Sequence, residues 1–105
     1  MGPFITLKQL VATETIKGGF LSSVQTENLT VAYTNMEPGT AVPLHQHHEE
    51  AIDIILEGIL EMQVGEKTAT LTPGMIVTVP SQVPHMAKAV THCRVVTIFH
   101  PKRNI

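Results

Sequence analysis

The sequence is poor in cysteine, in positive charge and in long apolar runs, and each of these is required by a whole class of proteins. Only one of its 105 residues is a cysteine, Cys93, so an internal disulfide is excluded and a reducing compartment is favoured. Seven basic residues are outnumbered by nine acidic ones, which leaves none of the positive charge that binding to nucleic acid demands. No apolar run is long enough to cross a bilayer, and no secretory signal is recognisable. We therefore expect a cytoplasmic protein that binds neither nucleic acid nor membranes.

Charged residues are also scarce. They make up 15% of the chain, against 43% for hydrophobic residues. A chain with this hydrophobic content folds, and its length suits one compact domain, residues 1–105, with its core at about 30–100. Because so few charges leave part of the surface without polar covering, we expect a homodimer.

Turn-forming residues recur about every ten positions, with short segments rich in valine, isoleucine, threonine and leucine between them. This spacing is typical of an all-β sandwich or barrel. Strands are expected at residues 20–26, 29–36, 45–48, 51–57, 59–64, 68–71, 75–79, 85–90 and 94–99. The segment 8–15 fits either a short helix or an edge strand.

The expected strand 51–57 carries apolar residues on both of its faces. One face has Ile52, Ile54 and Leu56, and the other has Ala51, Asp53, Ile55 and Glu57. We therefore expect both faces to be covered, the first of them by a second copy of the chain.

Histidines are concentrated at residues 45–48. On a strand, His45 and His47 would project from the same face, with their backbones roughly 7 Å apart, and their imidazoles could converge on one divalent ion. A third candidate is His85, because the two prolines in residues 80–84 stiffen the loop that leads to it. Antiparallel strands distant in sequence can be neighbours, so His85 could complete the same face. Taken singly, each histidine is explained equally well as a surface residue at a strand end.

With the glycines around them, these histidines resemble the first motif of the cupin family. Five residues separate Gly39 from the His45–x–His47 pair, and Gly58 closes the hairpin that follows. The likeness covers residues 30–100.

The second cupin motif is also recognisable. Five residues separate Gly74 from Pro80, and His85 follows five positions later. The resemblance implies a small jelly-roll β-barrel of two packed antiparallel sheets, usually dimeric. It also implies that His45, His47 and His85 bind a divalent metal ion inside the barrel.

The sequence departs from the first motif at the fourth metal ligand. Seven positions before Gly58, where the family usually has an acid or glutamine, stands Ala51, which cannot bind a metal. Glu50 is adjacent but should face away from the site on a regular strand. Asp53 shares the parity of Ala51 and is expected to point inward, as a fourth ligand, a water-mediated ligand or a catalytic general base. An inward acid satisfied by hydrogen bonds is an equally good interpretation.

The second motif departs too, with Gln82 in place of its glycine and Ala89 in place of its asparagine. The expected site therefore has three histidine ligands and open coordination positions. Three neutral ligands leave the full charge on the ion, which favours an anionic substrate or hydroxide. Imidazoles accept zinc, iron, nickel, copper and manganese, so the metal stays open.

The remaining residues of interest are given structural roles. We expect solvated side chains at His48, His92, His100 and the Lys102–Arg103 tail, core packing for Met36, Met62, Met75 and Met86, and a buried thiol at Cys93.

Three functions remain open. The closing stretch, residues 93–96 and 99–103, resembles small cupins of pectin breakdown, which implies a metal-dependent lyase or isomerase acting on an unsaturated uronate or another small carboxylate. A three-histidine cupin that activates dioxygen with Fe(II) is an alternative. A non-catalytic small-ligand sensor or metal-binding module is the third.

Overall fold

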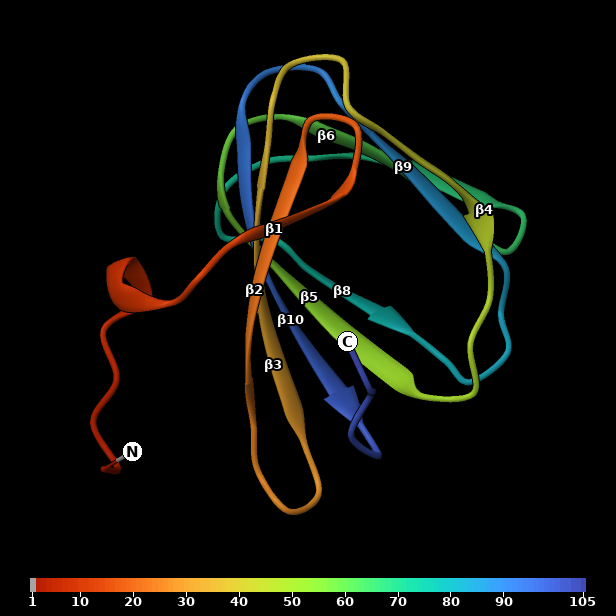
Figure 1. Ribbon diagram of the computed structural model, residues 1–105. Helices are drawn as coiled ribbons and strands as arrows, with labels where there is room; N and C mark the ends of the chain where they lie inside the picture. Colours follow the sequence, from red (N-terminus) through yellow and green to blue (C-terminus); the bar gives the residue numbers. More distant parts are fainter. Residues whose placement is uncertain (1) are drawn as a thin grey trace.

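The computed structural model describes residues 2–105 and is almost entirely β-structure (Figure 1). Its elements are a 3-10 helix η1 (Leu7–Gln9) and the strands β1 (Thr13–Ile16), β2 (Gly19–Gln25), β3 (Thr30–Met36), β4 (Ala41–His45), β5 (Glu50–Glu57), β6 (Leu60–Val64), β7 (Lys67–Leu71), β8 (Ile76–Val79), β9 (His85–Ala89) and β10 (Cys93–His100). They form a six-stranded sheet in the order β1-β2-β3-β10-β5-β8 and a four-stranded sheet in the order β4-β9-β6-β7. The two antiparallel sheets face each other as the walls of a small jelly-roll barrel, which confirms the expected fold class (Figure 1).

No helix within residues 2–105 is long and apolar enough to cross a membrane.

Eight of the expected strands correspond to β2, β3 and β5 to β10, with each end within one residue of its predicted place. The strand expected at 45–48 is wrong, because β4 ends at His45 instead of beginning there. Pro43 lies inside β4. β4 is an edge strand, so the missing N–H of a proline is tolerated there. The ambiguous segment 8–15 contains the last two residues of η1 and the start of the edge strand β1.

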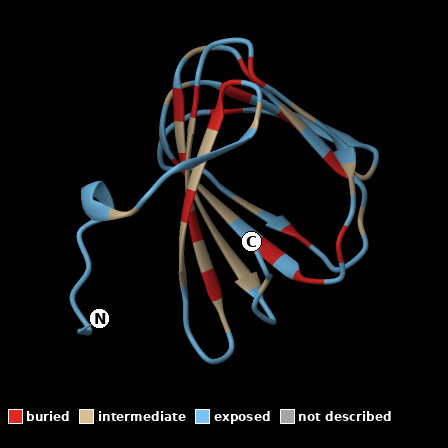
Figure 2. Cartoon of the chain, viewed as in Figure 1, coloured by how far each residue is buried: buried red, intermediate tan, exposed pale blue. Residues whose placement is uncertain are grey.

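The strand β5 alternates as its sequence predicts. Ala51 and Ile55 are buried between the sheets, whereas Ile52 and Leu56 lie on the outer face with 39% and 40% of their surface exposed. Both sheets contain buried residues (Figure 2). The apolar core they form consists of Met36, Ala51, Ile55, Leu60, Met62, Leu71, Val79, Ala89, Cys93 and Val95. Within one chain, only the inner face of β5 is covered.

Two positions with positive φ shape the turns around the motifs. Gly58 has φ 89°, and a Cβ there would collide with the carbonyl oxygen of His92. Gln82 has φ 63°, a conformation that residues with side chains seldom adopt. The family motif usually has a glycine at this position, and the positive φ explains why, because glycine adopts it without strain. Gln82 adopts the same backbone conformation.

Candidate metal centre

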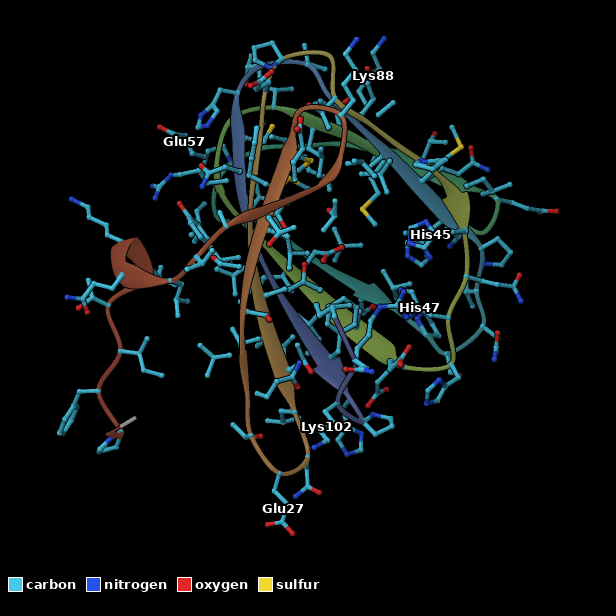
Figure 3. The ribbon with its side chains drawn as sticks, viewed as in Figure 1. Glu27, His45, His47, Glu57, Lys88 and Lys102 are labelled. Atoms are coloured by element: carbon cyan, nitrogen blue, oxygen red, sulfur yellow. The ribbon has the colours of Figure 1, made fainter. Side chains whose placement is uncertain are left out.

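Three histidines meet at one end of the barrel. His45 ends β4 and His85 begins β9, and the register of these paired strands makes them direct partners. His47 lies just beyond β4, where the chain turns toward β5. The ring centroids are 4.2 Å apart for His45 and His85, and 4.8 Å apart for His47 and His85. One nitrogen from each ring lies within 4.8 Å of the other two, a cluster that could hold a metal ion. Figure 3 shows His45 and His47 pointing from the β4 side into the barrel.

Backbone carbonyls fix the orientation of all three imidazoles. Nδ1 of His45 lies 2.8 Å from the carbonyl oxygen of Pro43, and Nδ1 of His85 lies 2.9 Å from that of Val83. Nδ1 of His47 lies 2.9 Å from the carbonyl oxygen of Glu49. A carbonyl only accepts, so each Nδ1 carries the proton and donates it. In the neutral ring this leaves Nε2 as the unprotonated nitrogen, as metal ligation requires.

The charge state of the rings also suits a metal. Burial lowers the pKa of both His47 and His85, and the backbone hydrogen bonds only partly oppose this effect. Both imidazoles are therefore neutral near pH 7. Three oriented imidazole nitrogens fit a divalent transition-metal ion and do not select one such metal over another.

The acids near the cluster are placed very differently. Ala51 is 4% exposed and faces inward, so the position of the usual fourth ligand carries only a methyl group, which cannot bind a metal. The side chain of Glu50 is 68% exposed, with an oxygen 3.9 Å from Nδ1 of His100, so it faces away from the cluster as expected. Asp53 does line the cavity beside the histidines, but its carboxylate is not part of the group of convergent ligand atoms in residues 2–105.

Asp53 is held by a partner on β10. The hydroxyl of Thr97 donates a hydrogen bond of 2.6 Å to Oδ1 of Asp53. Burial raises the pKa of Asp53, and this hydrogen bond and the nearby histidines only partly offset the effect. Asp53 is therefore an inward acid that keeps its proton to a higher pH than an exposed aspartate does.

Sequence reasoning missed a buried ion pair beside the centre. The side chain of Glu49 is only 7% exposed, and Nη1 of Arg103 donates to its Oε1 at 2.9 Å. Burial opposes ionisation of Glu49. Hydrogen bonds from its own backbone amide and from Arg103 outweigh that effect and lower its pKa. The guanidinium of Arg103 also lies 5.7 Å from the ring centre of Phe99, which packs edge-on against His47.

The expectation of a solvated Arg103 is therefore wrong. Its backbone N–H donates to the hydroxyl of Thr30 at 2.8 Å, and its carbonyl accepts from Nε2 of Gln25 at 2.9 Å. These bonds hold the C-terminal tail against β2 and β3. Nothing local in the sequence signals them, because the partners are more than 50 residues away.

The other predicted structural roles are mostly confirmed. The side chains of His48 and His92 are 64% and 49% exposed, and Cys93 is buried. Met36 and Met62 belong to the core, whereas Met75 and Met86 are exposed, so core packing is wrong for those two.

A cavity of about 380 Å³ opens beside the three histidines. Its lining residues include one carboxylate, Asp53, and one permanently positive side chain, Arg103. The remaining walls are largely apolar and come from both sheets, among them Leu21, Met36, Leu60, Met62 and Val95. The cavity thus combines the three histidines, Asp53 and Arg103 with walls that are largely apolar.

Comparison with known protein families agrees with this geometry. The model of the cupin domain matches residues 32–99. The chain belongs to the cupin domain family. The match contains His45, His47, Asp53 and His85, so every residue of the candidate site predicted from the sequence lies inside the cupin domain.

Solved structures share the cupin fold of this chain. An RmlC-like cupin from Shewanella frigidimarina has a TM-score of 0.93 at 21% identity, over 99% of this chain and 95% of the other. KdgF from a Halomonas species has a TM-score of 0.91 at 22% identity, over 99% of this chain and 97% of the other. A salicylate 1,2-dioxygenase from Pseudaminobacter salicylatoxidans has a TM-score of 0.78 at 17% identity, over 82% of this chain and 27% of the other. Identities this low show the fold alone. No curated protein matches the sequence.

Proposed function

We propose that this cupin is a metal-dependent enzyme acting on a small carboxylate, with His45, His47 and His85 as the metal ligands. The observation that carries the proposal is that each Nδ1 is bound to a backbone carbonyl, which leaves three Nε2 atoms free beside a cavity. A divalent ion there would act as a Lewis acid that polarises a carboxylate or carbonyl oxygen. Zinc, iron, nickel and manganese are all compatible with these ligands.

Arg103 supports an anionic substrate. It is the cavity's one permanent cation, and among the described residues only its Nη1 donates to an acid, Glu49. A guanidinium has five N–H donors in a planar fork, so the others remain for a carboxylate. Glu49 in turn fixes the position of the guanidinium, and Phe99 supports one face of it. Arg103 therefore orients the substrate beside the histidines.

Asp53 is the residue we assign to proton transfer. Its raised pKa brings its protonation equilibrium closer to neutral pH, where a general acid or base works best. The hydroxyl of Thr97 fixes the carboxylate on the cavity wall. An unsaturated uronate is the substrate that the C-terminal resemblance favours, and a cavity of about 380 Å³ has room for a small sugar acid.

Ala51 favours a second candidate. Without a carboxylate ligand at this position, the centre offers only neutral nitrogens, a donor set that also suits an Fe(II) dioxygenase. A small-ligand sensor or metal-binding module is the alternative without turnover.

One set of assays separates these functions. Protein purified without added metal is analysed for its elements and then assayed with unsaturated uronates and aromatic acids, with and without oxygen. We expect oxygen-independent turnover that a chelator abolishes. We also expect His47→Ala to lose both metal and turnover, while His48→Ala, which alters an exposed neighbour, keeps both. Oxygen uptake coupled to turnover would favour the dioxygenase. Tight ligand binding without turnover would favour the sensor.

We also propose that the protein is a cytoplasmic homodimer joined through the outer face of the six-stranded sheet. Ile52 and Leu56 support this, since each is about two-fifths exposed in a single chain. Light scattering at micromolar concentration tests the dimer, and a monomer would contradict it.

A further inference from the structure

The inner face of β10 shows how the cavity changes along its length. Phe99, Thr97 and Val95 alternate along the strand, and all three line the cavity. Phe99 packs edge-on against the ring of His47. Thr97 holds Asp53 by a hydrogen bond of 2.6 Å. Val95 lies about 13 Å along the strand from Phe99 and belongs to the apolar core, so the cavity has a polar end at the histidines and an apolar end beyond Thr97.

Arg103 lies at the polar end. Oε1 of Glu49 is 2.9 Å from Nη1 of Arg103 and 3.7 Å from Nδ1 of His47, so one carboxylate links the two side chains. The guanidinium is also 5.7 Å from the ring centre of Phe99. A ligand carboxylate bound by Arg103 would therefore lie near His47. The body of that ligand would extend along β10 toward Val95.

The apolar end offers a ligand few hydrogen-bond partners. Among residues 2–105, the polar side chains that line the cavity are the three histidines, Asp53, Arg103, Thr15, Thr34 and Thr97. The hydroxyl of Thr97 donates to Asp53, and Thr15 is exposed on the edge strand β1. Within this described part of the chain, Thr34, which pairs with Val95 across β3 and β10, is the one further hydroxyl for a ligand body.

A sugar acid and a hydrocarbon acid would bind differently in this cavity. Galacturonate and cyclohexanecarboxylate each have one ring and one carboxylate, but the sugar ring also carries several hydroxyls. A hydroxyl that loses its water without gaining a partner weakens binding by about tenfold. A hydrocarbon ring instead gains from burial against the core side chains that line the cavity, among them Leu60, Met62 and Val95.

We propose that the cavity selects carboxylates with a compact hydrocarbon body, aromatic or alicyclic, over sugar acids. Arg103 holds the carboxylate beside the histidines, and the body packs against Leu60, Met62 and Val95. A cavity of about 380 Å³ has room for one such ring. This inference rests on the proposed function, because it assumes a carboxylate substrate. It narrows the substrate class, since these walls weigh against the uronate that the C-terminal resemblance favours.

Binding of the two matched acids tests the proposal without requiring turnover. Isothermal titration of the Zn²⁺-loaded protein compares cyclohexanecarboxylate with galacturonate. We expect the Kd of cyclohexanecarboxylate to be lower by about tenfold or more. Equal affinities, or tighter binding of galacturonate, would overturn the inference and leave the proposed function standing. Binding of neither acid would also overturn it, and the turnover assays with uronates would then decide the proposed function separately.

Two valine variants on β10 test where the ring lies. Val95→Thr keeps the shape of the side chain but adds a hydroxyl to the cavity wall, so it should raise the Kd of cyclohexanecarboxylate by about threefold or more. Val96→Thr is the matched control, because it makes the same change on the opposite face of the strand, and it should alter this Kd by less than about twofold. Thermal melts show whether each variant is folded, and the comparison of the two acids on the unmodified protein depends on neither. A Kd that Val95→Thr leaves unchanged, or that both variants raise equally, would overturn the proposed position of the ring.

Discussion

His45 and His85 are direct partners across the β4–β9 pair, and their ring centres lie 4.2 Å apart. Strand register, and not local sequence, therefore brings the two cupin motifs together. A shift of one residue in this register would turn one of the two imidazoles away from the cavity. His47 then reaches the same point from the turn after β4.

Removing one ligand should separate metal binding from folding. We expect His85→Ala to weaken binding of a divalent ion by about 100-fold or more, because two imidazoles replace three. The metal-free variant should unfold as cooperatively as the metal-free parent, since the core of buried apolar residues needs no ion. Isothermal titration with Zn²⁺ and thermal melts check this. His48→Ala is the control, and an equal loss of affinity in it would contradict the assignment.

Asp53 should make the metal-free protein less stable as the pH rises. Its pKa is raised in the folded state, so below the unfolded pKa of about 4 the group is protonated in both states and costs nothing. As the pH rises toward and past the folded pKa, ionisation increasingly favours unfolding. Asp53→Asn removes this cost and should raise the free energy of unfolding at pH 7 by about 1 kcal/mol or more.

Urea unfolding of the metal-free protein at several pH values measures this effect. The advantage of Asp53→Asn should shrink as the pH falls toward 4. A constant advantage, or a loss of stability at pH 7, would show that ionisation of Asp53 is not the cause.

Arg103 should stabilise the fold through Glu49. Arg103→Met keeps the apolar part of the side chain but leaves a buried carboxylate without its ion partner, so the free energy of unfolding should fall by about 1–3 kcal/mol at pH 7. The pKa of Glu49 is lowered in the folded state. Its stabilising effect is therefore present above the unfolded pKa, near 4, and is lost as the pH falls through the folded pKa.

The double variant with Glu49→Gln isolates the pair. Combined with Arg103→Met, it should recover part of the lost stability, because no buried charge is left alone. Chemical denaturation measures the free energy of unfolding of both single variants and of the double variant. If the losses of the two single variants simply add in the double variant, Arg103 and Glu49 are not coupled.

Gln82 should tolerate only residues that suit its backbone. Its φ of 63° is costly for a residue with a side chain, and its N–H donates to the carbonyl of His47 at 2.8 Å. Gln82→Gly should leave stability equal or raise it by about 0.5 kcal/mol, whereas the β-branched Gln82→Val should lower it by about 1 kcal/mol or more. Equal melting temperatures for the two variants would argue against backbone strain at this turn.

Much of the fold was predictable because its signals are local. Turn residues and alternating apolar positions gave eight of the strands, and the spacing of glycines, prolines and histidines pointed to one cluster. The error at β4 came from placing a strand on the alternation of His45 and His47, whereas β4 precedes that pair and ends at His45. The strand geometry assumed for His47 was also wrong, although its ring still joins the cluster.

The parts that sequence reasoning missed depend on contacts between distant residues. Nothing local in the sequence marks Glu49 as buried, and it pairs with Arg103 of the returning C-terminal tail. The inward side chain of Asp53 was predictable from parity, but its bond to Thr97 requires the pairing of β5 with β10.

X-ray absorption spectroscopy of the protein loaded with one equivalent of metal shows whether His45, His47 and His85 bind the ion. We expect scattering from three imidazole nitrogens at about 2.0–2.1 Å for zinc, falling to two in His85→Ala. A spectrum with one imidazole or none, or one unchanged by His85→Ala, would show that the ion binds elsewhere.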